Sequence, residues 1–181
     1  LVQQLKKKHP QPKMALVVPM SSFRNTLKSV FKNVKGLKTS MVIGPAEVSK
    51  NKYDIVVVDE AHRLRQRVNL GAYFGAFDKA CERLGLDKMK SNELEWITMQ
   101  SENSIMFYDT AQSIKPSDVP QSAFDKVKQA PNTKIQRLIS QFRVRGGNAY
   151  VEFIDALLHN TLEKGQDPFK SKRYEFVLFD S

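Results

Sequence analysis

The stretch NKYDIVVVDEAHRLRQR, residues 51–67, most constrains what this chain can fold into. Its aliphatic residues 55–58 do not alternate with polar ones, which is typical of a strand buried on both faces of a parallel sheet. Two carboxylates, Asp59 and Glu60, follow at the point where the strand should end. Acids beside a buried strand are costly unless a positive group meets them. The stretch therefore predicts a central strand whose carboxyl end faces a cationic ligand.

Strand and helix patterns alternate along the rest of the chain, which predicts an α/β fold with a mostly parallel sheet. Further strands are expected at 14–19, 39–44, 104–109, 134–140 and 174–180. Apolar stripes with helical spacing predict the helices between them. The first helix should begin at a Ser21–Ser22 cap and end at Gly36, and the second should cover 70–84. A third should begin at an Asn92 cap, and a fourth, capped by Asp118, should cover 119–129. A fifth should begin at Gly146.

Composition limits the cellular setting and the partners. The net charge of +10 favours a polyanionic partner, because cationic side chains release counterions when they bind phosphates. The apolar runs are far too short to cross a membrane, and residues 1–11 lack the apolar segment of a signal peptide. The only cysteine, Cys81, cannot form an internal disulfide. We therefore expect a cytoplasmic protein without a membrane span.

The acids point to nucleotide chemistry. In parallel sheets, ligands bind beyond the carboxyl ends of the strands, where Asp59, Glu60 and Asp109 all fall. A magnesium ion bound to nucleotide phosphates would meet the acids, with Asp59 holding the metal and Glu60 positioning the attacking water. Two alternatives remain open. Asp59 could cap the next turn beside a solvated Glu60, or the three acids could form the metal site of a nuclease.

Four stretches, in order, resemble helicase motifs. VVVDEAH resembles the Walker B motif, or motif II, of helicases and related P-loop NTPases, and ALVVPMSSFRNTL resembles motif Ia. MFYDTAQSI resembles motif III, and LISQFRVRGGNAY resembles motif IV of superfamily-one helicases. Together they resemble the Schlafen group 3-like DNA/RNA helicase domain across nearly the whole chain. The resemblance implies a RecA-like P-loop NTPase core over 1–130 and the start of a second RecA-like domain over 131–181.

The resemblance also implies roles for individual residues, with ATP and Mg²⁺ as cofactors and single-stranded DNA or RNA as partner. Asp59 would hold the metal and Glu60 the water, Gln112 would sense the γ-phosphate, and Arg143 would act as an arginine finger. Asp109 would contact the nucleotide, and His62 would either bridge motif II to its neighbours or pack as a satisfied histidine. The expected nucleic-acid contacts are Ser21, Ser22, Arg24, Lys28, Lys32 and Lys35. The basic residues among these lie on the helix predicted to begin at Ser21–Ser22. The alternative is that they form an ordinary solvated face of that helix.

The sequence departs from the helicase pattern in two places. Tyr108 stands where motif III commonly has glycine, and no G-x-x-x-x-G-K-[ST] phosphate cradle occurs. We therefore expect the Walker A lysine upstream of Leu1 and further motifs beyond Ser181, so that residues 1–181 alone turn over negligible ATP. The competing hypothesis is a nucleic-acid-binding module that kept the fold and lost hydrolysis. Arg63, Arg65 and Arg67 should either contact nucleic acid or pair with acids of neighbouring loops.

Overall fold

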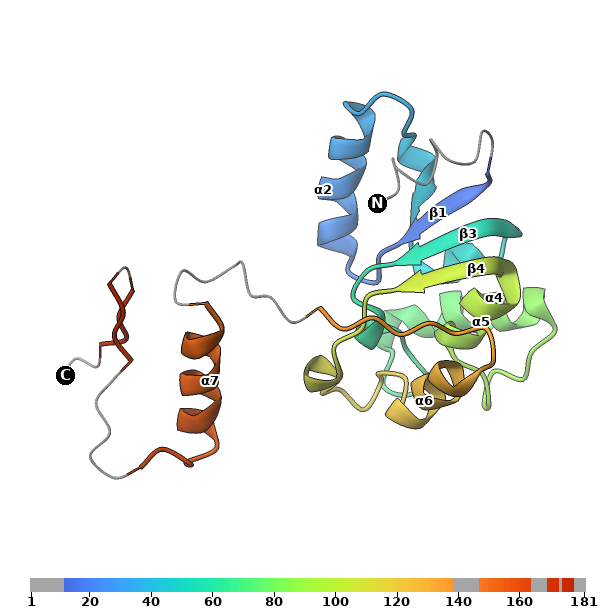
Figure 1. Cartoon of the computed structure of the whole chain (residues 1–181). Helices are drawn as coiled ribbons and strands as arrows, with labels where there is room; N and C mark the ends of the chain where they lie inside the picture. The colour runs from blue at the N-terminus through green and yellow to red at the C-terminus, as the bar shows by residue number, and fades with distance from the viewer. Residues whose placement is uncertain (1–11, 139–146, 164–168, 173, 178–181) are drawn as a thin grey trace. The chain divides into compact units, whose positions relative to one another are not determined.

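The computed structural model describes residues 12–138, 147–163, 169–172 and 174–177. The chain forms two compact units, Leu1–Thr133 and Lys134–Ser181, which are described separately (Figure 1). The expected boundary between two RecA-like domains, after residue 130, stays a prediction. The second unit's identity as a RecA-like domain stays a prediction.

A four-stranded, all-parallel sheet organises the first unit, with the strand order β2-β1-β3-β4 (Figure 1). The strands are β1 Met14–Val17, β2 Val42–Ile43, β3 Tyr53–Val58 and β4 Ser101–Met106. The predicted α/β class and parallel sheet are confirmed, and the apolar stretch is the internal strand β3. The strand expected over 39–44 is much shorter, because Thr39–Met41 forms a 3₁₀ turn, η1, before β2.

Helices cover both faces of this sheet and short 3₁₀ turns connect them. The α-helices of the first unit are α2 Ser21–Lys32, α3 Pro45–Val48, α4 Phe74–Leu84, α5 Glu93–Gln100 and α6 Gln121–Gln129. The remaining 3₁₀ turns are η2 Ala61–Arg63, η3 Gly71–Tyr73 and η4 Thr110–Gln112. The predicted helix over 70–84 therefore begins with a 3₁₀ turn, and α3 is an element that the sequence did not predict.

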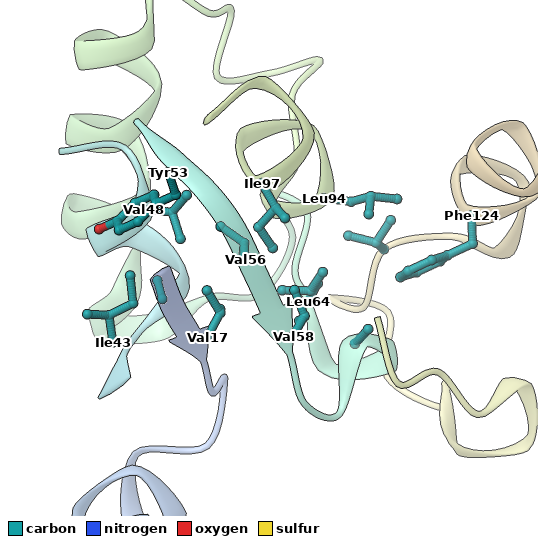
Figure 2. Packing of buried hydrophobic residues seen from close by; sticks show 13 residues of the cluster. Val17, Ile43, Val48, Tyr53, Val56, Val58, Leu64, Leu94, Ile97 and Phe124 are labelled. Carbon is teal, nitrogen blue, oxygen red and sulfur yellow. The ribbon is translucent and has the colours of Figure 1, made fainter. Parts of the chain in front are cut away.

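Alternating side chains of β3 supply two separate cores. Ile55 and Val57 pack in a cluster that contains Phe31 of α2. Val56 and Val58 point to the opposite face, where they meet Ile97 of α5 and the rest of a second cluster (Figure 2). All four valine and isoleucine side chains are at least nine-tenths buried. Burial on both faces explains why the aliphatic residues of β3 do not alternate with polar ones.

Helix ends differ from the predicted caps. The N-cap of α2 is Met20, without a side-chain hydrogen bond, and Ser21 and Ser22 occupy the first turn instead. The helix ends at Lys32 rather than near Gly36. Asn92 does cap α5, where its side chain accepts a hydrogen bond from the backbone N–H of Glu95 (3.1 Å).

The α6 cap was also predicted wrongly. Its N-cap is Pro120, and Asp118 lies two residues earlier. The Asp118 carboxylate instead accepts hydrogen bonds from the backbone N–H groups of Ile114 (3.2 Å) and Lys115 (2.9 Å). Asp118 therefore closes the loop before the helix rather than the helix itself.

In the second unit, the predicted helix is α7, Gly147–Leu158. The Tyr150 ring meets the rings of Phe169 (5.5 Å between centroids) and Tyr174 (4.8 Å) edge-on. The predicted strands are not formed in the described residues of this unit: residues 134–138 have no regular structure, and Glu175 makes only an isolated bridge with Lys170. Residues 139–140 and 178–180 of those predictions lie outside the described residues.

Candidate functional site

The segments that follow β1, β3 and β4 meet at the carboxyl edge of the sheet, as the parallel order requires. The backbone N–H of Asp59 donates to the carbonyl of Val17 (3.0 Å), which extends the pairing of β3 with β1. The N–H of Phe107 donates to the carbonyl of Val58 (3.0 Å), and the N–H of Ala61 donates to the carbonyl of Phe107 (2.8 Å). The segments after β3 and β4 are thus fixed to each other by their backbones.

Glu60 has an unusual backbone at this edge. Its φ of 53° and ψ of 47° lie in the left-handed region, which costs a non-glycine residue about 1–2 kcal/mol. The conformation is held from both sides, because the Glu60 N–H donates to Asp59 Oδ1 (3.1 Å) and the Arg63 N–H donates to the Glu60 carbonyl (2.8 Å). Both acids remain half-buried, so their carboxylates stay accessible at the end of β3.

His62 supports Glu60 from the interior. Its side chain is only 2% exposed, and its Nε2 lies 2.9 Å from Glu60 Oε2. This is ion-pair distance, at an angle that makes no hydrogen bond, and Nδ1 has no hydrogen-bond partner among the described residues. His62 is therefore buried behind Glu60, and its link to the carboxyl edge of the sheet is its contact with the Glu60 carboxylate. Its predicted direct contact with a cofactor stays a prediction.

Asp109 and Gln112 form a second polar pair, after β4. Asp109 Oδ1 accepts a hydrogen bond from the Ala111 N–H (3.0 Å), and Oδ2 accepts one from Gln112 Nε2 (2.7 Å). Both side chains are exposed. Asp59 and Glu60 thus lie together at the end of β3, and Asp109 and Gln112 form a separate pair after β4. No hydrogen bond or ion pair joins one pair to the other in the described part of the chain.

Tyr108, where motif III commonly has glycine, is a packing residue. Its ring stacks on Phe124 of α6 at 4.2 Å between centroids, and Lys128 Nζ lies 5.0 Å above the ring. Burial raises the pKa of the phenol. A tyrosine at this position, where the motif commonly has glycine, therefore packs the segment after β4 against α6.

The acids at the end of β3 could contribute one or two ligands to a magnesium ion, but not a complete set. The described residues contain no group of three or more His, Cys, Asp or Glu side chains that could hold a metal ion. Magnesium bound to a nucleotide usually takes most of its ligands from phosphates and water and only one or two from protein carboxylates. The oxygens of Asp59 and Glu60 therefore suit a phosphate-bound Mg²⁺, and do not form an all-protein cage.

Of the predicted basic residues, Arg24, Lys28 and Lys32 lie on α2 and Lys35 does not. Arg24 is half-buried, and its guanidinium lies where a side chain at Gly44 would be. Lys28 is half-buried, Lys32 is exposed on the last turn of α2, and Lys35 lies beyond the helix. Lys35 was therefore wrongly placed on the helical face. Arg143 lies outside the described residues.

The three arginines after motif II have different surroundings. Arg67 makes a two-pronged ion pair with Asp78, with Nε–Oδ1 at 2.7 Å and Nη2–Oδ2 at 2.9 Å. Arg63 and Arg65 instead line a pocket of about 370 Å³ with residues 19–22, Lys115 and Asp118. The sequence singled out neither Lys115 nor this pocket, because the pocket joins segments about 50 residues apart.

An α/β domain with an all-parallel sheet and acids beyond the central strand is consistent with the RecA-like class. The chain belongs to the Schlafen group 3 DNA/RNA helicase domain family, whose model matches residues 1–181. No curated protein and no solved structure matches the chain significantly. Membership of this family implies nucleic-acid binding and use of a nucleoside triphosphate. None of the described helices has the length and apolar character needed to cross a membrane.

Proposed function

We propose that this domain works in an ATP-dependent helicase that couples hydrolysis of Mg²⁺-bound ATP to movement along single-stranded DNA or RNA. Asp59 would supply the protein carboxylate to the metal's coordination or hydration shell. Glu60 would orient the attacking water and accept its proton. The Mg²⁺ ion, when bound, neutralises charge on the phosphates.

The geometry of Glu60 carries this proposal. A non-glycine residue persists in a left-handed conformation only where its surroundings enforce it, and such residues cluster at functional sites. A hydrogen bond from the Glu60 N–H to the Asp59 carboxylate and one from the Arg63 N–H to the Glu60 carbonyl enforce this conformation, while the buried His62 ring limits the directions that the Glu60 carboxylate can take. An ordinary solvated acid would need none of these supports. The arrangement therefore favours a positioned base over a strand-end turn with a solvated glutamate.

The pair Asp109 and Gln112 would report the state of the nucleotide. Their hydrogen bond holds the Gln112 amide on η4, which begins four residues after the end of β4, the strand that neighbours β3. A γ-phosphate at the edge could then attract or release this amide, and the backbone bonds between Phe107, Val58 and Ala61 would carry the change to the loop of Glu60. The arginine-finger role of Arg143 rests on the resemblance of its motif alone.

The test is Glu60→Gln in the full-length protein. The amide keeps the size of the side chain and cannot accept a proton, so we expect ATP to bind while turnover falls by about 10²–10⁴. Glu102→Gln is the matched control, because Glu102 is exposed on β4 and should leave turnover unchanged. Near-normal hydrolysis by Glu60→Gln would refute the assignment of the base.

The same assay separates the competing hypothesis of a binding module. A module that had lost hydrolysis would bind nucleic acid, and its wild-type form would show no nucleic-acid-stimulated ATP turnover. The nuclease hypothesis gains no geometric support, because Asp59, Glu60 and Asp109 do not come together as a metal cluster in the described residues.

A further inference from the structure

A basic pocket opens at the carboxyl edge of the sheet, beside the acids but lined by different residues. Its lining comes from the segments after all three longer strands: residues 19–22 after β1, Arg63 and Arg65 after β3, and Lys115 with Asp118 after β4. The volume of about 370 Å³ is within the range of small-ligand pockets. The topology of the sheet thus gathers three cationic side chains into one cavity.

The three cations have no ion pair with a carboxylate of the described residues. Arg63 Nε is buried and has no hydrogen-bond partner there, and a buried unpaired donor is destabilising until a ligand meets it. The Arg65 guanidinium lies 5.2 Å from the centre of the Tyr73 ring, a contact that orients it without neutralising its charge. Arg67, two residues further on, is by contrast fully paired with Asp78. The pocket therefore retains positive charge.

The other lining groups also favour an anion. Residues Ser21 and Ser22 open the 12-residue helix α2, whose first turn contains no acidic residue. Asp118 is the one carboxylate of the lining, and its Oδ2 is already bonded to two backbone N–H groups of the 114–118 loop. Serine hydroxyls, the N–H groups that open a helix and guanidinium groups together match a phosphate.

We infer that this pocket binds a backbone phosphate of the single strand, an inference that rests on the proposed nucleic-acid function. A nucleoside triphosphate is the less suitable ligand, because its magnesium needs a carboxylate, and one oxygen of Asp118, the one carboxylate of the lining, already accepts two hydrogen bonds. Asp59 and Glu60 do not line the pocket. The pocket is thus a seat for a phosphate diester, separate from the acids.

A short turn connects this seat to the proposed base. Arg63 is the last residue of η2, and its backbone N–H donates to the carbonyl of Glu60 (2.8 Å). A phosphate that draws the Arg63 side chain into the pocket therefore acts on the residue that fixes the conformation of Glu60. We expect a strand bound in this pocket to stimulate ATP turnover through this turn.

The experiment measures binding of a fluorescent 20-nucleotide oligo(dT) to the full-length protein by anisotropy over a series of salt concentrations. The variant Arg63→Gln/Lys115→Gln should weaken binding by about tenfold or more and reduce the slope of log Kd against log[salt] by about 1. Lys115→Gln alone changes an exposed side chain and should show part of the effect without a risk to folding. Lys79→Gln, an equal loss of charge on an exposed position of α4, is the control and should change the slope little.

A second measurement distinguishes a site for a phosphate of the bound strand from a site for a free phosphate ion. Inorganic phosphate at constant ionic strength should raise the Tm of the wild type more than that of Arg63→Gln/Lys115→Gln. If the wild type binds oligo(dT) and the double variant keeps the same affinity and salt slope, the inference is overturned. If the wild type binds no oligonucleotide while phosphate still stabilises it through these residues, the proposed function fails, and the pocket is a site for a free anion instead.

Discussion

Glu93 offers a test of how the loop after motif II is anchored. This carboxyl is only 1% exposed, and it accepts hydrogen bonds from the Arg65 N–H (2.9 Å) and from the Tyr73 hydroxyl (2.7 Å). Burial raises the pKa of Glu93 to about 7, although these two hydrogen bonds oppose the shift. The folded protein therefore holds a proton on Glu93 at a pH where the unfolded chain has lost it.

The sign and size of the effect follow from this difference. Between pH 4.5, the ordinary pKa of a glutamate side chain, and about pH 7, the folded state binds one proton more than the unfolded state, so stability falls as the pH rises. Each pH unit costs about 1.4 kcal/mol, which gives a loss of about 3 kcal/mol across the interval. Above pH 7 the ionised carboxylate is buried at full cost.

We expect Glu93→Gln to remove this pH dependence. The amide oxygen can accept from the Arg65 N–H, and the amide nitrogen can donate to the Tyr73 oxygen if the hydroxyl rotates, so both contacts survive. The variant should be similar to the wild type near pH 5 and more stable by about 3 kcal/mol near pH 8. The free energy of unfolding, measured with urea at intervals from pH 5 to pH 8, provides the comparison.

Glu95→Gln is the control, because Glu95 lies on the first turn of the same helix but is half-buried. It should leave the pH profile of stability unchanged. A Glu93→Gln variant with the wild-type profile would refute the argument. So would a variant that is destabilised equally at every pH, because that would show a role for the carboxyl in packing alone.

Two further predictions concern the sheet and α2. Ile97→Ala, which empties a fully buried site against β3, should lower the free energy of unfolding by about 2–5 kcal/mol, whereas Met99→Ala at a 41% exposed site of α5 should cost well under about 1 kcal/mol. Equal losses from the two variants in urea titrations would contradict the assigned core. Lys28→Ala/Lys32→Ala should weaken single-strand binding and flatten its salt dependence by about 1–2 in slope, with Lys126→Ala on α6 as control. An unchanged slope would remove α2 from the path of the strand.

The sequence predicted the sheet well because burial on two faces leaves a direct mark on composition. Residues 55–58 could only be an internal strand, and the acids after them had to lie at its carboxyl end. The bond between Asp109 and Gln112 was not predicted, but it is local in the same way, because the two residues are three positions apart. Predictions of this kind depend on neighbours in the chain, which the sequence displays.

The predictions that were wrong, or that could not be made, depend instead on how a loop closes, on how a helix faces the sheet or on contacts between residues far apart in the chain. Asp118 looked like a helix cap, but its two hydrogen bonds with the 114–115 backbone close the preceding loop. Phe23 and Val30 fit an apolar stripe, yet they are 38% and 50% exposed, because only part of that stripe faces the sheet. The pocket could not be predicted at all, since Lys115 and Arg63 line the same pocket only once β3 and β4 are paired. Tertiary contacts decide these outcomes, and local patterns do not record them.

The loop after β3 places the Glu60 carboxylate at the proposed nucleotide site and the Arg63 guanidinium in the neighbouring pocket. The alternation of buried and exposed residues along the loop explains this arrangement. Ala61, His62 and Leu64 are buried, whereas Glu60 and Arg63 remain partly exposed. The buried side chains hold the backbone against the core, so a carboxylate and a guanidinium three residues apart project outward without having to pair with each other. Glu93 then fixes the end of this loop through the Arg65 N–H. If a nucleotide meets the acid and a strand phosphate meets the cations, one rigid turn transmits each event to the other, as coupling between hydrolysis and movement requires.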